Sequence, residues 1–478
     1  MNLSIIIYII GHVLRIEGLF LFLPCLTALI YREKSGFAFL ITAILCIALG
    51  RLATFRKPKN TVFYGKEGFV TVSMCWIILS IFGSLPFLIN GEIPSVPDAL
   101  FETISGFTTT GSTILTDIES LSRCTLLWRS FTHWIGGMGV LVFVLAVLPI
   151  AGGGSQMYLM RAESPGPSVN KLVPRVKNTA MLLYGIYIVI TLVQIVLLLI
   201  GGMPLFDALT SAFGTAGTGG FGIRNDSFAG YSTFCQGVTT VFMILFGINF
   251  NIYYLLLCRK HRQAFQSDEL RTYLGIILIS TVLIAFNIRH LFPGLKALHH
   301  AAFQVASIIT TTGFATEDFN TWPELSRMIL VCLMFFGACA GSTGGGIKIS
   351  RVLILVKSIK KELFSIVHPR SVKKIRVDGQ VIEHDVIRSV NVYMAAYLVI
   401  IMVSVLLVSL ENLDTTTTVT SVITTLNNIG PGLEIVGPTG NFSSFSALSK
   451  FVFMFDMLAG RLEIFPLLIL FLPDTWKK

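Results

Sequence analysis

The chain contains many long apolar segments, and this feature constrains its fold more than any other. A helix needs about 20 mostly apolar residues to cross the hydrocarbon core of a bilayer. Segments of this kind recur along the whole sequence. The ten predicted spans are residues 3–30, 36–55, 69–90, 125–149, 179–202, 234–258, 271–292, 326–347, 389–410 and 447–473. The sequence therefore predicts an all-α polytopic membrane protein with ten transmembrane helices.

The composition agrees with a membrane protein and excludes other classes. Only 13% of the 478 residues are charged, whereas an average soluble domain has about 25%. This low charge and the high hydropathy exclude a soluble enzyme, a disordered protein and a secreted disulfide scaffold. The eight cysteines are scattered without a CxxC pair, which favours small buried side chains over disulfides or metal ligands.

The net charge of +10 is explained by an uneven distribution of Lys and Arg across the membrane. With the N-terminus in the cytoplasm, 25 of the 36 Lys and Arg residues lie in cytoplasmic segments. This bias follows the positive-inside rule, so we expect both termini in the cytoplasm and no nucleic-acid partner. Many acidic residues lie on the outer side, where they predict a vestibule that concentrates cations. The alternative is that these acids merely follow the topology.

Four outer segments share one pattern and indicate an internal repeat. Each has a short half-helix, then a turn rich in Thr, Ser and Gly, and each lies between two predicted spans. The segments are DALFETISGFTTTG (98–111), DALTSAFGTAGTGG (207–220), AAFQVASIITTTG (301–313) and TTTTVTSVITTLNNIG (415–430). The pattern predicts helix, half-helix, loop and helix four times in parallel, preceded by two extra N-terminal helices.

A short helix that stops inside the membrane suits the conduction of cations. The C-terminal end of a helix carries partial negative charge, so four such ends around one axis stabilise a cation between them. The following loop can replace the hydration shell of the ion with backbone carbonyls. Glycine allows the backbone angles and the close approach that such a loop needs. One TTTG segment alone would be interpreted as an ordinary turn, but four equivalent segments favour a pore.

With these residues in view, the sequence resembles the Trk/Ktr/HKT superfamily of potassium transporters, and most closely its bacterial TrkH branch. The two extra N-terminal helices favour this branch over the shorter Ktr subunits. The resemblance is carried by SGFTTTGST (105–113), TGGFG (218–222), TTTGFAT (310–316), AGSTGGGIK (340–348) and TTLNNIGPGLEIVGP (424–438).

The resemblance implies potassium uptake through a channel-like, pseudo-fourfold pore. K⁺ is the implied permeant ion, bound by backbone carbonyls of a selectivity filter. Because the four loops differ from one another, we expect weaker selectivity than in true potassium channels. The implied filter residues are Thr109, Thr110, Gly111, Thr218, Gly219, Gly220, Thr311, Thr312, Gly313, Asn428, Ile429 and Gly430.

The resemblance also implies partners, location and internal boundaries. It implies a homodimer in the bacterial inner membrane, in contact with lipid, that binds a cytosolic TrkA-type regulatory subunit. NAD and ATP are expected on that partner, and no covalent or nucleotide cofactor is expected in this chain. The implied units are an N-terminal extension (1–60) and four pore repeats (61–160, 161–262, 263–360 and 361–478).

Residues 337–348, GACAGSTGGGIK, place five glycines in the eighth predicted span. Each Gly costs a helix roughly 1 kcal/mol relative to Ala, so this stretch is expected to interrupt the helix. The resemblance implies an intramembrane loop that closes the pore below the filter, with Gly344, Gly345, Gly346, Lys348 and Arg461 as gate residues. The alternative is a close-packed helix crossing.

Arg461 lies within the last predicted span, where a charge is costly and usually functional. It is expected to face the pore, where it repels cations or holds the gate loop through backbone carbonyls. The alternative is a structural ion pair with Asp456 or Glu463. Arg129 and His133 lie one helical turn apart, and they either brace the first filter loop from behind or pack between helices.

Two basic segments, 161–178 and 352–388, are candidate docking surfaces for the regulatory subunit. The alternative for both is solvated charge near the lipid surface.

An ion-coupled secondary transporter, carrying K⁺ with H⁺ or Na⁺ or an organic solute, is the alternative function. Such transporters usually contain inverted repeats, whereas these repeats are parallel. No enzymatic activity is expected, because the sequence has no HExxH, no GxSxG and no close pair of carboxylates within the spans.

Overall fold

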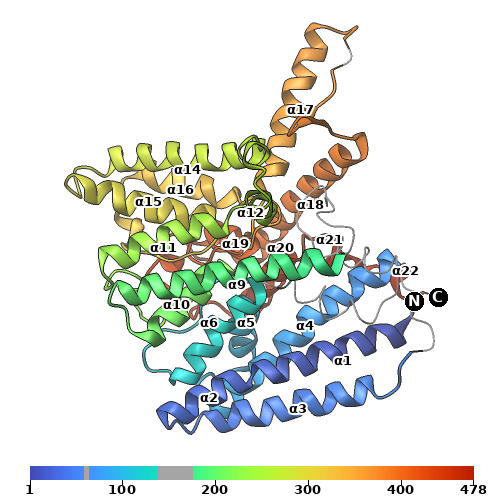
Figure 1. Ribbon diagram of the computed structural model, residues 1–478, viewed down its shortest axis with the longest axis vertical. Coiled ribbons are helices and arrows are strands. Elements are labelled where there is room, and N and C mark those ends of the chain that lie inside the picture. Colours follow the sequence, from blue (N-terminus) through green and yellow to red (C-terminus); the bar gives the residue numbers. More distant parts are fainter. Residues whose placement is uncertain (59–63, 138, 140–175, 372, 478) are drawn as a thin grey trace.

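The computed structural model describes residues 1–58, 64–137, 139, 176–371 and 373–477. The described chain is predominantly helical (Figure 1). The helices of the first half are α1 Leu3–Phe20, α2 Phe22–Tyr31, α3 Gly36–Thr54, α4 Gly65–Asn90, α5 Val96–Phe107, α6 Arg123–Gly137, α9 Val176–Ile200, α10 Leu205–Gly217 and α11 Thr233–Phe246. The later helices are α12 Phe250–Leu257, α13 His261–Phe265, α14 Asp268–Asn287, α15 Leu295–Ile309, α16 Glu324–Phe335, α17 Ile349–Val367, α18 His384–Val408, α19 Thr415–Leu426, α20 Ala447–Arg461, α21 Phe465–Leu468 and α22 Pro473–Trp476.

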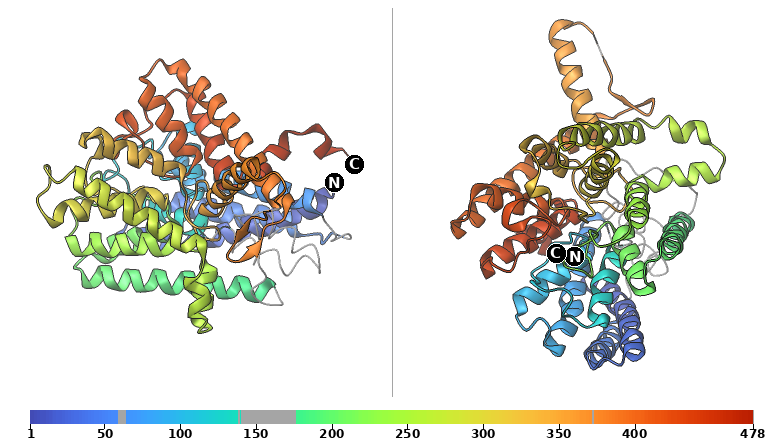
Figure 2. Two further views of the ribbon diagram at one scale, coloured as in Figure 1. Left: turned by 90° about the horizontal axis from the view of Figure 1, so that it is seen from above. Right: turned by 90° about the vertical axis from the view of Figure 1, so that its left-hand side faces the viewer.

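The long helices run roughly side by side, and the chain winds around a common centre. The right-hand view of Figure 2 looks along these helices, and the chain passes around the molecule from blue through green and yellow to red. This order brings the last part of the chain back beside the first. The N- and C-termini lie close together at one end of the molecule (Figure 1).

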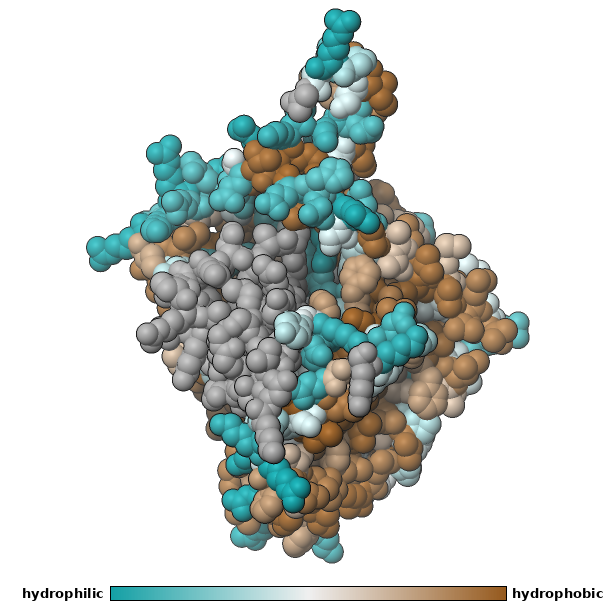
Figure 3. All heavy atoms as spheres, turned by 90° about the vertical axis from the view of Figure 1, so that its right-hand side faces the viewer, coloured by the Kyte–Doolittle hydropathy of each residue, from teal (hydrophilic) through white to brown (hydrophobic). Residues whose placement is uncertain are grey.

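Six helical segments of the described chain are long and apolar enough to cross a membrane, and they match six of the ten predicted spans. In Met181–Ile200 and His384–Glu411, only 22% of the most apolar 18-residue window is buried inside the protein. The exposed apolar side chains of these helices need a nonpolar solvent, which a bilayer provides. Figure 3 shows apolar residues over much of one face, with hydrophilic residues around the projecting α17. The six segments are Leu3–Tyr31, Gly36–Thr54, Gly65–Asn90, Met181–Ile200, Asp268–Asn287 and His384–Glu411.

Three other predicted spans are broken. The break in 326–347 agrees with the interruption expected from its glycines, whereas the expectation of continuous helices in 234–258 and 447–473 is wrong. Residues 234–258 form α11 and α12, which meet at a bend of 90°. In 326–347, α16 ends at Phe335, immediately before the glycine-rich stretch. In 447–473, α20 ends at Arg461, because Glu463 and Ile464 adopt left-handed φ angles of 59° and 67°, which a right-handed helix cannot contain.

The remaining predicted span, 125–149, begins as α6 and continues outside the described residues. Residues 161–175 of the first candidate docking segment also lie outside them.

A small β-hairpin departs from the all-α prediction. Strand β1 (Arg376–Val377) pairs antiparallel with β2 (Gln380–Val381). The two residues of the turn, Asp378 and Gly379, both have positive φ, at 51° and 76°. Asp-Gly is a preferred pair for this two-residue turn, so the local sequence is sufficient to explain the hairpin. It follows α17, which projects from the body of the molecule (Figure 1).

Trp128 on α6 ties the N-terminal helices to the first short helix of the pattern. Its fully buried ring lies edge-on to Phe39 of α3 and Phe107 of α5, with centroids 6.4 and 6.0 Å away. Its indole N–H donates to the backbone oxygen of Gly83 on α4, at 3.0 Å. The N-terminal extension is therefore joined to the core that positions α5.

Substitution of Phe39 tests this packing. Phe39 is 0% exposed, whereas Phe37 on the same helix is 70% exposed. Phe39→Ala is expected to lower the free energy of unfolding by about 3–5 kcal/mol through loss of buried contacts. Phe37→Ala is the matched control, with an expected change within about 0.5 kcal/mol. Thermal unfolding in detergent measures both, and equal losses would contradict the assigned packing.

Candidate functional site

Four short helices of the described chain correspond to the four predicted half-helices. They are α5, α10, α15 and α19, with 12, 13, 15 and 12 residues. At a rise of about 1.5 Å per residue they extend roughly 18–23 Å, too short for a hydrocarbon core of about 30 Å.

Asp414 caps α19 by accepting the Thr417 N–H at 2.8 Å. Hydrogen bonds from Thr417 hold the pKa of the Asp414 carboxyl below its usual range.

All four short helices end with the same backbone geometry. The residue two positions before the final Gly is left-handed in each loop, with φ of 56° at Thr109, 55° at Thr218, 58° at Thr311 and 54° at Asn428. Residues other than Gly rarely adopt this backbone conformation. The final glycines Gly111, Gly220, Gly313 and Gly430 also have positive φ, at 81°, 77°, 86° and 99°.

A shared hydrogen bond closes each of these helix ends. The residue before the final Gly donates its N–H to the carbonyl five residues earlier, as in a Schellman ending. Because each helix ends at this bond, the carbonyls of the loop that follows take no part in helical hydrogen bonds. The four bonds are Thr110 to Ser105 (2.9 Å), Gly219 to Gly214 (2.8 Å), Thr312 to Ser307 (2.8 Å) and Ile429 to Thr424 (3.0 Å).

The four loops contact one another in a closed ring. A Cβ atom added to the final Gly of any loop would lie close to a carbonyl oxygen of a neighbouring loop, and the fourth loop returns to the first. No side chain fits at the first three of these positions without displacement of backbone. The contacts are Gly111 to Gly219 O (2.0 Å), Gly220 to Thr312 O (1.9 Å), Gly313 to Ile429 O (2.1 Å) and Gly430 to Thr110 O (2.9 Å).

A cavity of about 100 Å³ adjoins the ring and is lined by all four final glycines. Its charged lining residues, within the described part of the chain, are Arg129 and Arg224, and none is acidic. The expectation of an acidic vestibule is therefore wrong for the space directly over the ring. Several predicted outer acids are instead engaged by cations: Asp98 by Lys450 (2.7 Å), Asp226 by Arg224 (4.0 Å) and Glu434 by Arg327 (2.5 Å).

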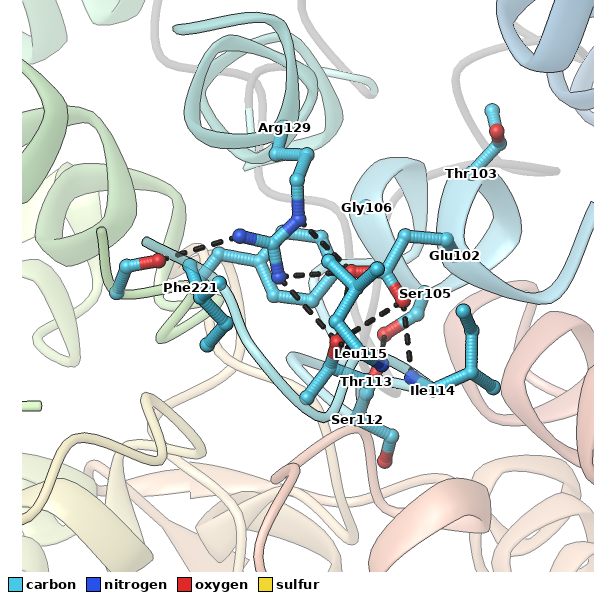
Figure 4. Close-up of polar contacts among 12 residues, drawn as sticks. Glu102, Thr103, Ser105, Gly106, Ser112, Thr113, Ile114, Leu115, Arg129 and Phe221 are labelled. Carbon is cyan, nitrogen blue, oxygen red and sulfur yellow. Dashed lines mark hydrogen bonds and ion pairs between the residues drawn. The ribbon is translucent and has the colours of Figure 1, made fainter. Parts of the chain in front are cut away.

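A buried ion pair supports the first and second loops from behind (Figure 4). Arg129 on α6 lies 2.7 Å from Glu102 on α5, and their side chains are 1% and 0% exposed. Glu102 also accepts hydrogen bonds from the Thr113 hydroxyl (2.9 Å) and the Ile114 N–H (3.1 Å), which follow the first loop. Arg129 donates to the Gly222 carbonyl after the second loop, at 3.2 Å. The pair thus joins one short helix to two loops.

His133 makes a second link between the same two repeats. The Phe221 N–H donates to its Nε2 at 3.1 Å, so Nδ1 carries the proton and donates to the Gly106 carbonyl at 2.8 Å. These contacts agree with the interpretation of Arg129 and His133 as a brace. The sequence did not identify Glu102 as their partner, although a carboxylate inside a short intramembrane helix was an available signal.

Residues 337–348 form a non-helical loop between α16 and α17, as the glycines predicted. Arg461 donates to the carbonyl of Thr343 in this loop at 2.9 Å and to that of Gly136 at 2.5 Å. The buried Lys348 ammonium donates to the carbonyls of Gly344 and Gly345. Of the gate residues, Gly346 has a left-handed φ of 66°.

The two acids considered as alternative partners of Arg461 are engaged elsewhere. Glu463 forms an ion pair with Arg351 at the start of α17. Asp456 accepts a hydrogen bond from the Ser404 hydroxyl at 2.8 Å. Sequence reasoning also missed Glu269. Its carboxylate accepts the N–H groups of Ala340 in the loop (2.7 Å) and of Ser350 in the first turn of α17 (3.1 Å), and so it ties the loop to the start of α17.

The described residues contain no group of three or more His, Cys, Asp or Glu that could hold a metal ion. All eight cysteines lie in the described part and are free thiols. The candidate site therefore consists of backbone carbonyls, hydroxyl groups and the loop with its cationic partners.

Comparisons with known proteins agree in family and extent. A family model described as TrkH, cation transport protein, matches residues 35–288 and 291–478. The Trk system potassium uptake protein TrkH of Salmonella typhimurium is 37% identical over 492 residues, and that of Escherichia coli K12 is 36% identical over 491, each covering 100% of both chains. The crystal structure of the potassium transporter TrkH from Vibrio parahaemolyticus superposes with a TM-score of 0.89, at 33% identity and 100% coverage of both chains.

Glu102→Gln tests the energetic importance of the buried pair. It leaves the Arg129 guanidinium buried without a counter-charge, and the expected loss of stability is about 3–5 kcal/mol. Asp226→Asn is the control, because its pair with Arg224 is exposed and is worth at most about 1 kcal/mol. Thermal unfolding of both proteins in detergent measures the difference. Similar melting temperatures would show that Arg129 does not depend on Glu102.

Proposed function

Because the chain belongs to the TrkH family of cation transport proteins, we propose that it mediates potassium uptake across the bacterial inner membrane through a channel-like pore. The closed ring of four loops with one shared backbone geometry is the observation that carries this proposal. Full-length relatives at 36–37% identity are potassium uptake proteins, which supports K⁺ as the permeant ion. The chain is a transporter and not an enzyme in this proposal.

The proposed selectivity filter consists of the three residues at the end of each loop. These are Thr109–Gly111, Thr218–Gly220, Thr311–Gly313 and Asn428–Gly430. In an extended strand successive residues face opposite sides. Left-handed residues at the first and third positions break this alternation and allow successive carbonyls to face one axis. The helix ends behind them add partial negative charge. K⁺ would bind to these carbonyls without a fixed carboxylate.

We further propose an architecture of ten spans arranged as four parallel repeats around a pseudo-fourfold pore. The extension occupies residues 1–60, and the repeats occupy 61–160, 161–262, 263–360 and 361–478. The four similar helix ends and the circular course of the chain support this division. Because the residue types of the four loops differ, the K⁺ over Na⁺ selectivity should be weaker than with four identical loops.

The proposed gate is the loop formed by residues 337–348, below the filter. Gly344, Gly345 and Gly346 allow the backbone to lie against the ring, and Lys348 holds two of their carbonyls. Arg461 joins the loop to Gly136 on α6, which supports a role in keeping the path closed. Its positive charge would also oppose the passage of a cation.

The proposed partners act from the cytoplasmic side. A TrkA-type subunit that binds NAD and ATP would dock on the basic segment 352–388. A second copy of the chain would cover the apolar face of the projecting α17, which exposes Val356, Ile359, Leu363, Ile366 and Val367. The proximity of the two termini supports their placement on the same, cytoplasmic side. The remaining apolar surface would contact lipid.

Potassium uptake by K⁺-starved cells that lack their own transporters tests the proposal. Expression of the chain together with its regulatory subunit should restore uptake, and each component alone should restore much less. Currents carried by purified protein in bilayers with K⁺ as the only permeant cation, at symmetrical pH, distinguish a pore from the ion-coupled alternative. Strict dependence of K⁺ flux on a second ion would contradict the channel-like mechanism.

Gly313→Ser tests the filter. Its Cβ would lie 2.1 Å from the Ile429 oxygen, and its φ of 86° disfavours any side chain. Displacement of that carbonyl is expected to lower the K⁺/Na⁺ permeability ratio about tenfold, equivalent to about 1.4 kcal/mol. Gly275→Ser is the control, because a Cβ there meets nothing within 4 Å. Reversal potentials under bi-ionic conditions give the ratio, and an unchanged ratio would remove Gly313 from the filter.

Arg461→Ala tests the gate. It removes two charge-assisted hydrogen bonds, each worth about 1.5–3 kcal/mol, from the proposed closed state. Rubidium flux into proteoliposomes without the regulatory subunit is expected to rise about tenfold or more. The exposed Arg289 is the control, and Arg289→Ala should leave flux unchanged. If Arg461→Ala protein conducts like the unmodified chain, Arg461 does not hold the gate.

A further inference from the structure

The third loop of the ring is bonded directly to the loop below it. The N–H of Gly345 donates to the Thr311 hydroxyl at 2.7 Å, and both residues lie in the interior. Thr311 is the left-handed residue that ends the third short helix, and Gly345 is the central glycine of the GGG run. This bond therefore joins the proposed filter to the proposed gate without an intervening residue.

The glycines at this contact have no space for side chains. A Cβ on Gly344 would lie 3.1 Å from the Thr310 carbonyl oxygen, and one on Gly345 would lie 2.6 Å from that of Asn427. Thr310 and Asn427 are the residues that cap the C-terminal ends of α15 and α19. The backbone of the lower loop thus lies against the ends of the third and fourth short helices.

The peptide group between Gly344 and Gly345 is bonded at both ends. Its N–H, from Gly345, donates to the Thr311 hydroxyl, and its carbonyl, from Gly344, accepts a hydrogen bond from the Lys348 ammonium. A hydrogen-bonded peptide is strengthened when its other end is also bonded, because the two bonds polarise each other. The ammonium therefore favours the donation from Gly345 to Thr311.

The equivalent residues of the other loops have different partners. The Thr218 hydroxyl donates to the carbonyl of Gly217 at 2.6 Å, within its own loop. The Asn428 amide donates to the Met457 carbonyl on α20 at 2.9 Å. Within the described residues, the Thr109 hydroxyl makes no hydrogen bond. Direct bonding to the lower loop is therefore a property of the third repeat.

We propose that Thr311 is a positioning residue that couples the gate to the filter. While the lower loop is in place, the Gly345 N–H occupies a lone pair of the Thr311 hydroxyl and holds the inner end of the third filter loop. Departure of the loop frees this hydroxyl and lets the filter loop relax. Gate position and ion selectivity are then linked through a single hydrogen bond. This inference rests on the proposed function.

Thr311→Val tests the coupling, because it keeps the shape of the side chain and removes the acceptor. Loss of one neutral hydrogen bond shifts an equilibrium about 2- to 12-fold, so rubidium flux without the regulatory subunit should rise by that factor. The K⁺/Na⁺ permeability ratio should fall in the same protein. Thr311→Ser, which retains the hydroxyl, should reverse most of both changes. Thr191→Val is the control, because it removes a buried hydroxyl that bonds within α9.

The outcomes separate this inference from the proposed function. A rise in flux together with a fall in selectivity, at an unchanged melting temperature, supports coupling. Wild-type values of either quantity in Thr311→Val protein overturn it, since a contact that only holds the gate does not reach the filter. If Gly313→Ser also leaves selectivity unchanged, then the filter assignment itself fails. Gly345→Ala, whose Cβ would push against Asn427, should raise flux in the same direction.

Discussion

The last carbonyl groups of four helices that end inside the protein are the constraint from which this architecture follows. A helix end leaves backbone groups without partners, and inside a membrane such groups must be satisfied by protein or face water. In this chain, one Schellman-type bond per helix stabilises the turn, and a left-handed residue directs the chain away from the helix. Each final Gly then lies against a carbonyl oxygen of one neighbouring loop, and these contacts close into a ring. The same backbone demand thereby accounts for the ring and, in the proposed function, for its attraction for a cation.

The four repeats share a backbone but differ in the side chains that support it. Nine residues before the final Gly stand Glu102, Ser211, Gln304 and Ser421. Glu102 holds an ion pair with Arg129, whereas Gln304 makes a long hydrogen bond of 3.5 Å to the Phe314 carbonyl. The first repeat therefore has a rigid charged support that its counterpart in the third repeat lacks. This asymmetry suits a pore in which one side of the ring is fixed and another contacts a moving element.

The charged residues below the ring bond to the loop as well as to one another. Lys348 and Arg461 donate to its carbonyls, and Glu269 accepts the N–H of Ala340. Arg351, at the exit of the loop, pairs with Glu463 at the break in the last helix. A loop without helical hydrogen bonds needs such external partners, because its peptide groups are otherwise unsatisfied. Loss of a few of these bonds would free it, which agrees with a movable element.

Much of the fold and part of the candidate site follow from the sequence alone. Apolar segments of spanning length determine a helical membrane protein, and most of the spans appear where hydropathy placed them. The glycines of the TTTG-type endings and of the GGG run indicate where helices stop, because Gly readily adopts positive φ and weakens a helix without reference to the rest of the chain. Asp378-Gly379 determines a hairpin turn in the same way.

The choice of partners was decided only by the tertiary structure. Sequence reasoning identified no partner for Glu102. It left three roles open for Arg461: to repel cations, to hold the gate loop, or to pair with Asp456 or Glu463. Packing brought Glu102 to Arg129, 27 residues away, and Arg461 to Thr343, 118 residues away. It also brought several of the outer acids, among them Asp98, Asp226 and Glu434, into ion pairs. A residue's type and local spacing limit which bonds it can form, but the bonds it does form depend on which distant segments share its buried space, where every polar group must find a partner.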